Sequence, residues 1–168
     1  MYVLDMIQRR KKKNYFKAVI EAQKPLCVKL SRRVNFNEVD VMGIAWHGRY
    51  CQYFEEGAAA LGRACGLSYG DYKDANLFAP IVQHHVDYHL PLWLDEEFII
   101  SASLMWNEGA RLNTEFALIK LDGNVAASGY TVQMFINAET KEPCFDLPNL
   151  IKRCHEKWKS GEFACLQK

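Results

Sequence analysis

Residues 36–56 read FNEVDVMGIAWHGRYCQYFEE, and this stretch changes character near its middle. Asp40, Gly43 and Gly48 interrupt its first half, so a regular helix or strand is not expected there. The second half predicts a helix that begins at about Arg49 and ends at about Cys65. Helical spacing places five residues on one face of this helix, namely Tyr50, Phe54, Gly57, Leu61 and Cys65.

Asp40 and His47 are the candidate catalytic residues because of where they stand relative to the predicted helix. Asp40 lies in the turn before the helix, and His47 lies at the helix N-terminus. Backbone N–H groups lack helical partners at that end, and the helix dipole is positive there. A carboxylate beside such donors suits attack on a carbonyl group, whose oxygen becomes an oxyanion. The simpler alternative is that Asp40 caps the turn and His47 only begins the helix.

The same stretch resembles the signature of 4-hydroxybenzoyl-CoA thioesterase-like hotdog proteins, in particular the YbgC-type acyl-CoA thioesterase branch. The matching positions are Glu38, Asp40, Gly43, His47, Tyr50 and the aromatic-aromatic-acid run at 53–55. The resemblance extends in order from about residue 26 to 155. The chain departs from the common pattern at Arg49, where asparagine is usual, and at Val41-Met42, where small residues are usual. These departures concern acyl specificity more than chemistry.

The resemblance implies an α+β hotdog fold, in which a five-stranded antiparallel sheet wraps around a long central helix. The expected organisation is a basic N-terminal arm over residues 1–23, the hotdog domain over residues 24–160, and a C-terminal tail over residues 161–168. The resemblance also implies a homodimer or homotetramer. Two subunits would pair edge to edge and form their active sites at the interface.

The implied activity is that of an acyl-CoA thioesterase, with CoA or an acyl-carrier protein as the thiol component. Asp40 would act as general base toward water or as nucleophile at the thioester carbon, and both routes need the same ionised carboxylate. The backbone N–H of His47 would hold the thioester oxygen. The candidate substrate-binding residues are Gly43, Ile44, Trp46, Tyr50, Phe78 and Ile81. No cofactor and no metal is expected.

Two other functions are compatible with the same residues. A hotdog dehydratase acting on 3-hydroxyacyl thioesters would use the His47 side chain for proton transfer. A non-catalytic acyl-thioester binding protein would not need Asp40, so the presence of Asp40 argues against it. Glu55 and Glu56 are rival carboxylates, because other hotdog branches place the catalytic carboxylate on the central helix.

The composition is that of one domain with a substantial hydrophobic core. The chain has 168 residues, of which 49% are hydrophobic, and its net charge of +1 does not favour nucleic acid as a partner. Its 6 cysteines form no CxxC pair, which indicates reduced thiols and a cytoplasmic location. It contains no run of about 18 apolar residues, so no membrane span is expected.

Alternating patterns and turn signals predict the remaining elements. Strands are expected over residues 25–36, 81–90, 96–106, 111–121 and 125–137. Asp122-Gly123 favours a hairpin turn, and Gly129 indicates either a bulge or a close backbone approach. A final amphipathic helix is expected to bury Leu150, Ile151, Cys154 and Trp158.

Residues 67–80 are expected to form a loop with one short helix. The loop carries the aromatic residues Tyr69, Tyr72 and Phe78. These side chains either pack back onto the core or form one wall of an acyl pocket.

Two charged patterns have both a simple and a specific interpretation. His85, Asp87 and His89 alternate along a predicted strand and share one face, which could hold zinc or could simply be a polar outer face. The basic run Arg9–Lys13 predicts a solvated, partly helical arm. Its specific alternative is docking to phosphates or to an acidic carrier protein.

Overall fold

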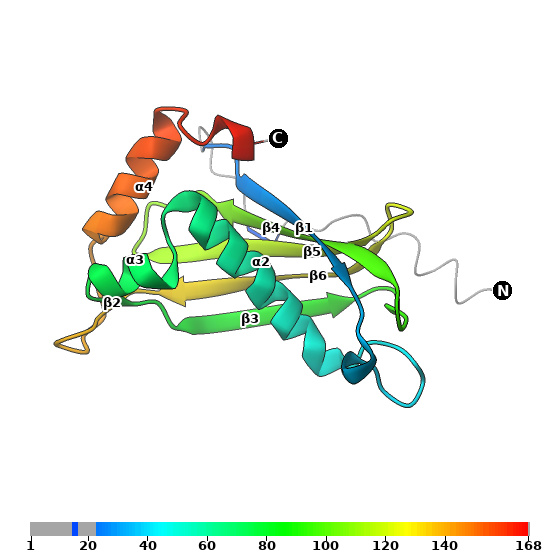
Figure 1. The fold of residues 1–168 in the computed structure, drawn as a ribbon. Coiled ribbons are helices and arrows are strands. Elements are labelled where there is room, and N and C mark those ends of the chain that lie inside the picture. Colours follow the sequence, from blue (N-terminus) through cyan, green and yellow to red (C-terminus); the bar gives the residue numbers. More distant parts are fainter. Residues whose placement is uncertain (1–14, 17–22, 168) are drawn as a thin grey trace.

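The computed structural model describes residues 15–16 and 23–167, and a five-stranded antiparallel sheet forms its centre. The strands are β1 Leu26–Arg33, β3 Ile81–Tyr88, β4 Glu97–Met105, β5 Arg111–Lys120 and β6 Val125–Met134. Their order across the sheet is β1-β4-β5-β6-β3, so β1 and β3 are its edges (Figure 1). The predicted α+β class and the antiparallel sheet are confirmed.

Helix α2, Tyr50–Cys65, lies across one face of the sheet (Figure 1) and begins within one residue of the predicted start. The 3-10 turn η2, His47–Arg49, precedes it, and Gly66 ends it with a φ of 69°. The predicted apolar face is buried, and Tyr53 is buried with it. The ring of Phe54 stacks on that of Phe116 in β5, with centroids 4.5 Å apart.

Two glycines let the helix and the sheet approach closely. A Cβ added to Gly57 of α2 would lie 2.9 Å from Cγ2 of Ile100. A Cβ added to Gly129 of β6 would lie 2.1 Å from the carbonyl oxygen of His85 and 2.6 Å from the ring of Phe54. The close approach predicted at Gly129 is therefore confirmed. The alternative of a bulge at Gly129 is wrong, because β6 keeps a regular register with β3 there.

The strand predicted over residues 125–137 is divided in two, so the expectation of one continuous strand is wrong. β6 ends at Met134, and Phe135 is fully buried. The next two residues form β7, Ile136–Asn137, which pairs with β2, Leu77–Phe78, in a separate two-stranded sheet. Alternation of apolar residues marks a strand but does not show where that strand changes partners, so this break had no local signal.

The remaining helices agree with the sequence. α3, Tyr69–Asp74, is the short helix expected between residues 67 and 80, and α4, Asn149–Lys159, is the final amphipathic helix. The predicted face of α4 is buried. Short 3-10 turns occur at η1, Phe36–Glu38, and at η3, Ala164–Leu166, and Gly123 has the positive φ of 87° expected in its hairpin. No described helix is long and apolar enough to cross a membrane.

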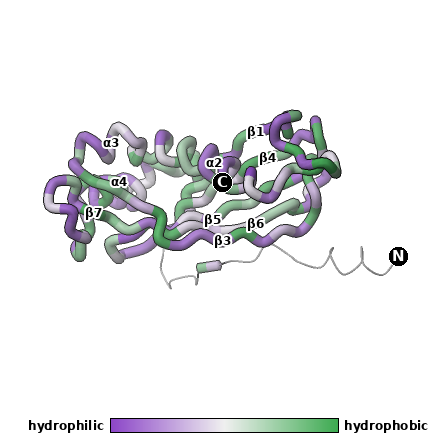
Figure 2. The backbone as a smooth tube through the Cα atoms, turned by 90° about the horizontal axis from the view of Figure 1, so that it is seen from below, coloured by the Kyte–Doolittle hydropathy of each residue, from purple (hydrophilic) through white to green (hydrophobic). Residues whose placement is uncertain are grey.

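The outer face of the sheet, which is the face away from α2, holds part of the predicted arm. The backbone N–H groups of Tyr15 and Phe16 both donate to Oε1 of Glu115, at 2.8 and 3.1 Å. The hydroxyl of Tyr15 donates to Oδ2 of Asp87 and lies 2.7 Å from Oγ of Ser128. Figure 2 shows this short coloured piece beside the sheet, opposite α2. The sequence predicts a solvated arm, but residues 15 and 16 are half-buried against the sheet. The basic run Arg9–Lys13 lies outside the described residues.

The predicted polar outer face of β3 is observed. Nε2 of His85 lies 3.3 Å from Oδ2 of Asp87, and Nε2 of His89 is 2.8 Å from Oγ of Ser128. No group of three or more His, Cys, Asp or Glu side chains that could hold a metal occurs among the described residues. On the opposite face, Tyr88 packs against Tyr50 of α2, with ring centroids 4.9 Å apart.

Candidate active site

The turn that carries Asp40 is closed by its own backbone and side chain. The N–H of Asp40 donates to the carbonyl of Ile44 at 2.9 Å, and the N–H of Gly43 donates to the carbonyl of Asp40 at 3.0 Å. Oδ1 of Asp40 accepts from the N–H of Met42 at 2.8 Å, and Gly43 has a φ of 74°. The carboxylate therefore caps the turn through one oxygen. This arrangement fixes its position ahead of α2.

His47 opens the turn η2, directly before α2. The N–H groups of Arg49 and Tyr50 donate to the carbonyls of Trp46 and His47, but no described residue accepts a hydrogen bond from the N–H of His47 or Gly48. The carbonyl of His47 also accepts from the hydroxyl of Tyr88 at 3.1 Å, which ties the helix start to the end of β3. The helix start can therefore offer unpaired donors to an oxyanion.

Gly48 is needed for a close contact with Trp46 and not for a positive φ. Among the glycines of this region, Gly43 has a positive φ and Gly48 does not. A Cβ added to Gly48 would lie 2.1 Å from Cζ3 of Trp46. The indole ring therefore covers the helix start at a distance that only glycine permits. Trp46 itself remains 49% exposed.

A salt-bridge network connects the Asp40 turn to β1 and α2. Nη2 of Arg32 lies 2.6 Å from Oε1 of Glu38, and Nε of Arg32 lies 3.0 Å from Oε2 of Glu56. Oε2 of Glu38 accepts from the N–H of Asn35 at 2.7 Å, and Glu38 is 6% exposed. A buried carboxylate needs such partners. Glu56, one of the rival carboxylates, is engaged in this structural contact.

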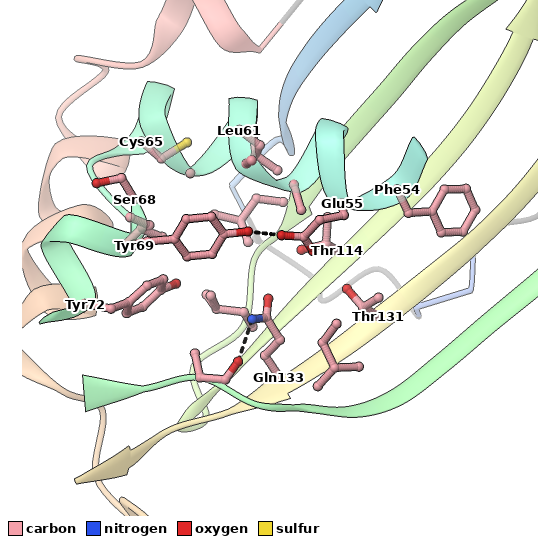
Figure 3. A pocket seen from close by; sticks show the side chains of 18 of the residues that line it. Phe54, Glu55, Leu61, Cys65, Ser68, Tyr69, Tyr72, Thr114, Thr131 and Gln133 are labelled. Atoms are coloured by element: carbon pink, nitrogen blue, oxygen red, sulfur yellow. Dashed lines mark hydrogen bonds between the residues drawn. The ribbon is translucent and has the colours of Figure 1, made fainter. Parts of the chain in front are cut away.

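A cavity of about 570 Å³ lies between α2, α3 and the sheet. Along the helix, its lining begins at Cys51, the second residue of α2, and it continues past the end of the helix to Tyr72 (Figure 3). Most of the wall is apolar, and burial raises the pKa of the Cys65 thiol to about 12, so this cysteine stays protonated. The size and lining fit a small-molecule site.

Several polar groups interrupt this apolar wall. Thr114 of β5 and Thr131 of β6 are opposite each other and both line the cavity. Nε2 of Gln133 donates to the carbonyl of Ala79 at 2.7 Å (Figure 3), which orients the amide. At the helix side, the hydroxyl of Tyr69 donates to Oε1 of Glu55. The second rival carboxylate is thus at the cavity wall.

The predicted site residues do not all lie together. Ile81 lines the cavity, and Phe78 lines a smaller hollow beside it. Neither space is lined by the residues around the helix start, which are Asp40, Gly43, Ile44, Trp46, His47 and Tyr50. Tyr50 is 4% exposed and packs against Tyr53 and Tyr88. A single chain therefore does not place Asp40 in the wall of the cavity.

Tyr69 and Tyr72, which the sequence predicts either to pack onto the core or to form one wall of an acyl pocket, both line the cavity. The polar residues Thr114, Thr131 and Gln133 line it as well and were not predicted. Their signal was the placement of polar side chains at inward positions of predicted strands. That signal depends on knowing which face of each strand turns inward.

Comparison with known proteins agrees with this architecture. Residues 34–153 match the thioesterase-like superfamily. A candidate esterase of Aquifex aeolicus (strain VF5) is 31% identical over 97 residues, which is 58% of this chain and 74% of that protein. A candidate acyl-CoA thioesterase of Bacillus subtilis (strain 168) is 23% identical over 110 residues, covering 66% of this chain and 80% of that protein.

A solved structure shows the same fold. The DHNA-CoA thioesterase from Staphylococcus aureus superposes with a TM-score of 0.70 at 19% identity, over 83% of this chain and 95% of that chain. At this identity the likeness concerns the fold. The match of residues 34–153 covers most of the chain and includes both the Asp40 turn and α2. The chain therefore belongs to the thioesterase-like superfamily, has a hotdog fold and is a thioester hydrolase.

Proposed function

We propose that this chain is an acyl-CoA thioesterase, with Asp40 as its catalytic carboxylate and the helix start at His47 as its oxyanion site. The observation that carries the proposal is the Asp40 turn followed directly by the N–H groups of His47 and Gly48, for which no described residue is an acceptor. The similarity to a candidate acyl-CoA thioesterase of Bacillus subtilis and to the DHNA-CoA thioesterase of Staphylococcus aureus supports CoA as the thiol component.

The reaction needs one ionised carboxylate and one oxyanion site. As a general base, Asp40 takes a proton from water while the water oxygen attacks the thioester carbon. As a nucleophile, Asp40 attacks that carbon itself, and water then opens the mixed anhydride. In both routes the thioester oxygen gains negative charge, which the N–H of His47 stabilises. The carbon–sulfur bond then breaks, and CoA leaves as a thiolate that takes up a proton.

The edge strand β3 offers a surface for a second copy of the chain. Its residues are mostly exposed, and an unpaired strand edge readily pairs with another chain. Exposed apolar residues gather at both ends of this edge. At one end lie Tyr88, whose hydroxyl contacts the helix start beside Trp46, and Trp93, which pairs with Ile44 of the Asp40 turn. At the other end lie Phe78, Ile81 and Val82, where β3 begins. Antiparallel pairing of β3 with itself would bring each group toward the other, which is typical of a self-complementary interface.

The register of this pairing is limited by the pleat of the strand. Directly opposite residues in an antiparallel pair point to the same face. The two-fold axis must therefore lie between the two copies of one residue, so that this residue faces itself across the interface. Near the middle of β3, that residue is His84 or His85. Tyr88 of the partner subunit then lies beside the Pro80–Val82 end of β3, where the register with β6 is irregular between Ile81 and Gln83. Because Tyr88 holds the carbonyl of His47 within a chain, the partner's helix start arrives beside the Ile81 end of the cavity.

This pairing would bring together the Asp40 turn and the cavity, which lie apart within a single chain. Each active site would combine the Asp40 turn of one subunit with the cavity of the other. The acyl group would occupy the cavity, and the reacting carbon would lie at its edge. A dimer is therefore the smallest unit that we propose to be active.

Replacing Asp40 by asparagine tests the assignment of the carboxylate. The amide oxygen of Asp40→Asn can still accept from the N–H of Met42, so the turn should be retained. We expect turnover to fall at least about 10²-fold with acyl-CoA substrates, while circular dichroism stays unchanged. Glu55→Gln, which alters the rival carboxylate, should retain turnover.

Two results would contradict this proposal. Near-normal turnover of Asp40→Asn together with an inactive Glu55→Gln would move the reaction to the helix. A panel that includes a 3-hydroxyacyl thioester separates hydrolysis from dehydration. Loss of water without release of a free thiol would show the dehydratase instead.

A further inference from the structure

A second hollow of about 320 Å³ adjoins the cavity, between α3 and the small β2–β7 sheet. The two spaces have four lining residues in common, Tyr69, Tyr72, Ala79 and Gln133. Figure 3 shows the two tyrosines projecting from α3 and Gln133 projecting from β6 at this boundary. The two spaces therefore meet at these residues.

The second hollow differs from the cavity in charge. Lys73 is the one charged residue among the described residues that line it. At its rim, Nζ of Lys141 lies 4.4 Å from the ring centroid of Phe78, which is 50% exposed. Nζ of Lys141 also donates to the carbonyl of Ala138 at 2.5 Å. Within the described part of the chain, neither lysine forms an ion pair with a carboxylate. Two ammonium groups without a carboxylate partner among the described residues thus border a hollow that is open to solvent.

We propose that the second hollow holds the pantetheine arm of CoA and that Lys73 and Lys141 hold its phosphates. This inference rests on the proposed thioesterase function and places the leaving group of that reaction. Lysine ammonium groups suit phosphate as point charges. The pantetheine arm carries two amides, and the residues that line the hollow include Asn76 and Gln133, whose side-chain amides have matching chemistry.

The two spaces match the two halves of an acyl-CoA molecule. The mainly apolar cavity suits the acyl group, and the polar hollow with its basic rim suits the CoA portion. The boundary between them includes Ala79, one residue before Pro80. The proposed β3 pairing brings the helix start of the partner subunit to this same place. The thioester carbon would thus lie between the two spaces, beside Asp40 of the partner subunit.

Binding of free CoA and of pantetheine tests the inference without depending on catalysis. We expect the Lys73→Glu/Lys141→Glu variant to bind CoA about 10-fold more weakly in isothermal titration, because two favourable charge contacts become repulsive. Pantetheine lacks phosphates, so its affinity should not change. Lys29→Glu is the matched control, because Lys29 lies exposed on the far edge strand β1 and should bind CoA like the unmodified protein. Raising the salt concentration screens these charges, so it should reduce the difference in CoA affinity between the double variant and the unmodified protein.

A second variant tests the hollow itself. Ala138 lines the hollow, and Ala138→Trp should weaken CoA and pantetheine alike, because the indole group would occupy the space of the arm. Circular dichroism checks that both variants are folded. Unchanged CoA affinity in the double lysine variant would overturn the proposal, as would an equal loss for CoA and pantetheine.

The kinetics separate this inference from the proposed function. KM for an acyl-CoA should rise about 10-fold in the double lysine variant, while KM for the matching acyl-pantetheine and kcat for both should stay the same. If CoA binding follows the expected pattern but no thioester is hydrolysed, the subsite stands and the thioesterase proposal fails. If thioesters are hydrolysed but the lysines have no effect on CoA, the subsite is wrong and the function stands. Slower hydrolysis of acyl-carrier-protein substrates alone would assign the lysines to a carrier protein and overturn the CoA subsite.

Discussion

Mixing two inactive variants should restore activity if each active site combines the Asp40 turn of one subunit with the cavity of the other. Asp40→Asn removes the carboxylate. Ala59→Trp fills the cavity from α2, because Ala59 belongs to its wall. Thr114→Phe fills it from the opposite wall and serves as a second blocking variant if the first disturbs the helix.

The size of the effect follows from the symmetry of the pairing. In a mixed dimer, one site combines both defects, and the other combines an intact carboxylate with an intact cavity. Random mixing of equal amounts makes about half of all dimers mixed, and each of these has one working site of two. The mixture should therefore reach about one quarter of wild-type turnover. Each variant alone should remain at about 1% or below, on the scale of a lost general base.

The assay uses differently tagged variants that are produced together, so that dimer composition can be measured. Hydrolysis should be followed by the loss of thioester absorbance. A thiol reagent is less suitable because Cys51 and Cys165 are exposed and would react with it. Native mass measurements confirm that the variants still associate.

The matched control places both substitutions in one chain and mixes that chain with the wild type. Shared sites predict that such mixed dimers are inactive, which leaves only the wild-type dimers, about one quarter of the total. Sites contained within one subunit predict about one half instead. The shared site would be refuted if the mixture of the two single variants recovered no turnover while the mixture of double variant and wild type kept about one half of wild-type turnover.

Substitutions at His47 and Tyr15 give two further tests. His47→Tyr should keep much of the turnover, whereas His47→Pro lacks the N–H donor and should lose about 10²- to 10³-fold. Equal loss in both, with circular dichroism and dimer mass unchanged, would show that the imidazole itself takes part. Burial raises the pKa of Tyr15 from 10.0 to about 12, so its stabilising effect is complete below pH 10 and is lost as the pH rises toward 12. Tyr15→Phe should lower the free energy of unfolding by about 1 kcal/mol at neutral pH and flatten its decline at alkaline pH. An unchanged profile in urea titrations would contradict the docking of residues 15–16.

Local signals in the sequence determined much of the fold. The spacing of apolar residues marked α2 and α4, and glycine marked the places where a positive φ or a close approach was needed, as at Gly123 and Gly129. The alternation of apolar residues located every strand of the main sheet to within a few residues. The turn before α2, with Asp40 and His47, was likewise visible because its residues are close in sequence. Elements formed by residues close in the chain produce a regular spacing of apolar residues, which is visible in the sequence itself.

Contacts between distant residues left no such trace, and only the tertiary structure decided them. Glu115 is 3% exposed and accepts from the backbone of Tyr15, about 100 positions earlier in the chain. Phe135 is buried in the core, and β6 ends there because the next two residues, Ile136 and Asn137, pair with β2. The cavity depends on which residues of β5 and β6 turn toward α2, and on α3 closing one end. The sequence by itself determined the elements and the candidate catalytic residues before α2. The packing of one element on another determined where the cavity lies, because side chains far apart in the chain must meet to form its wall.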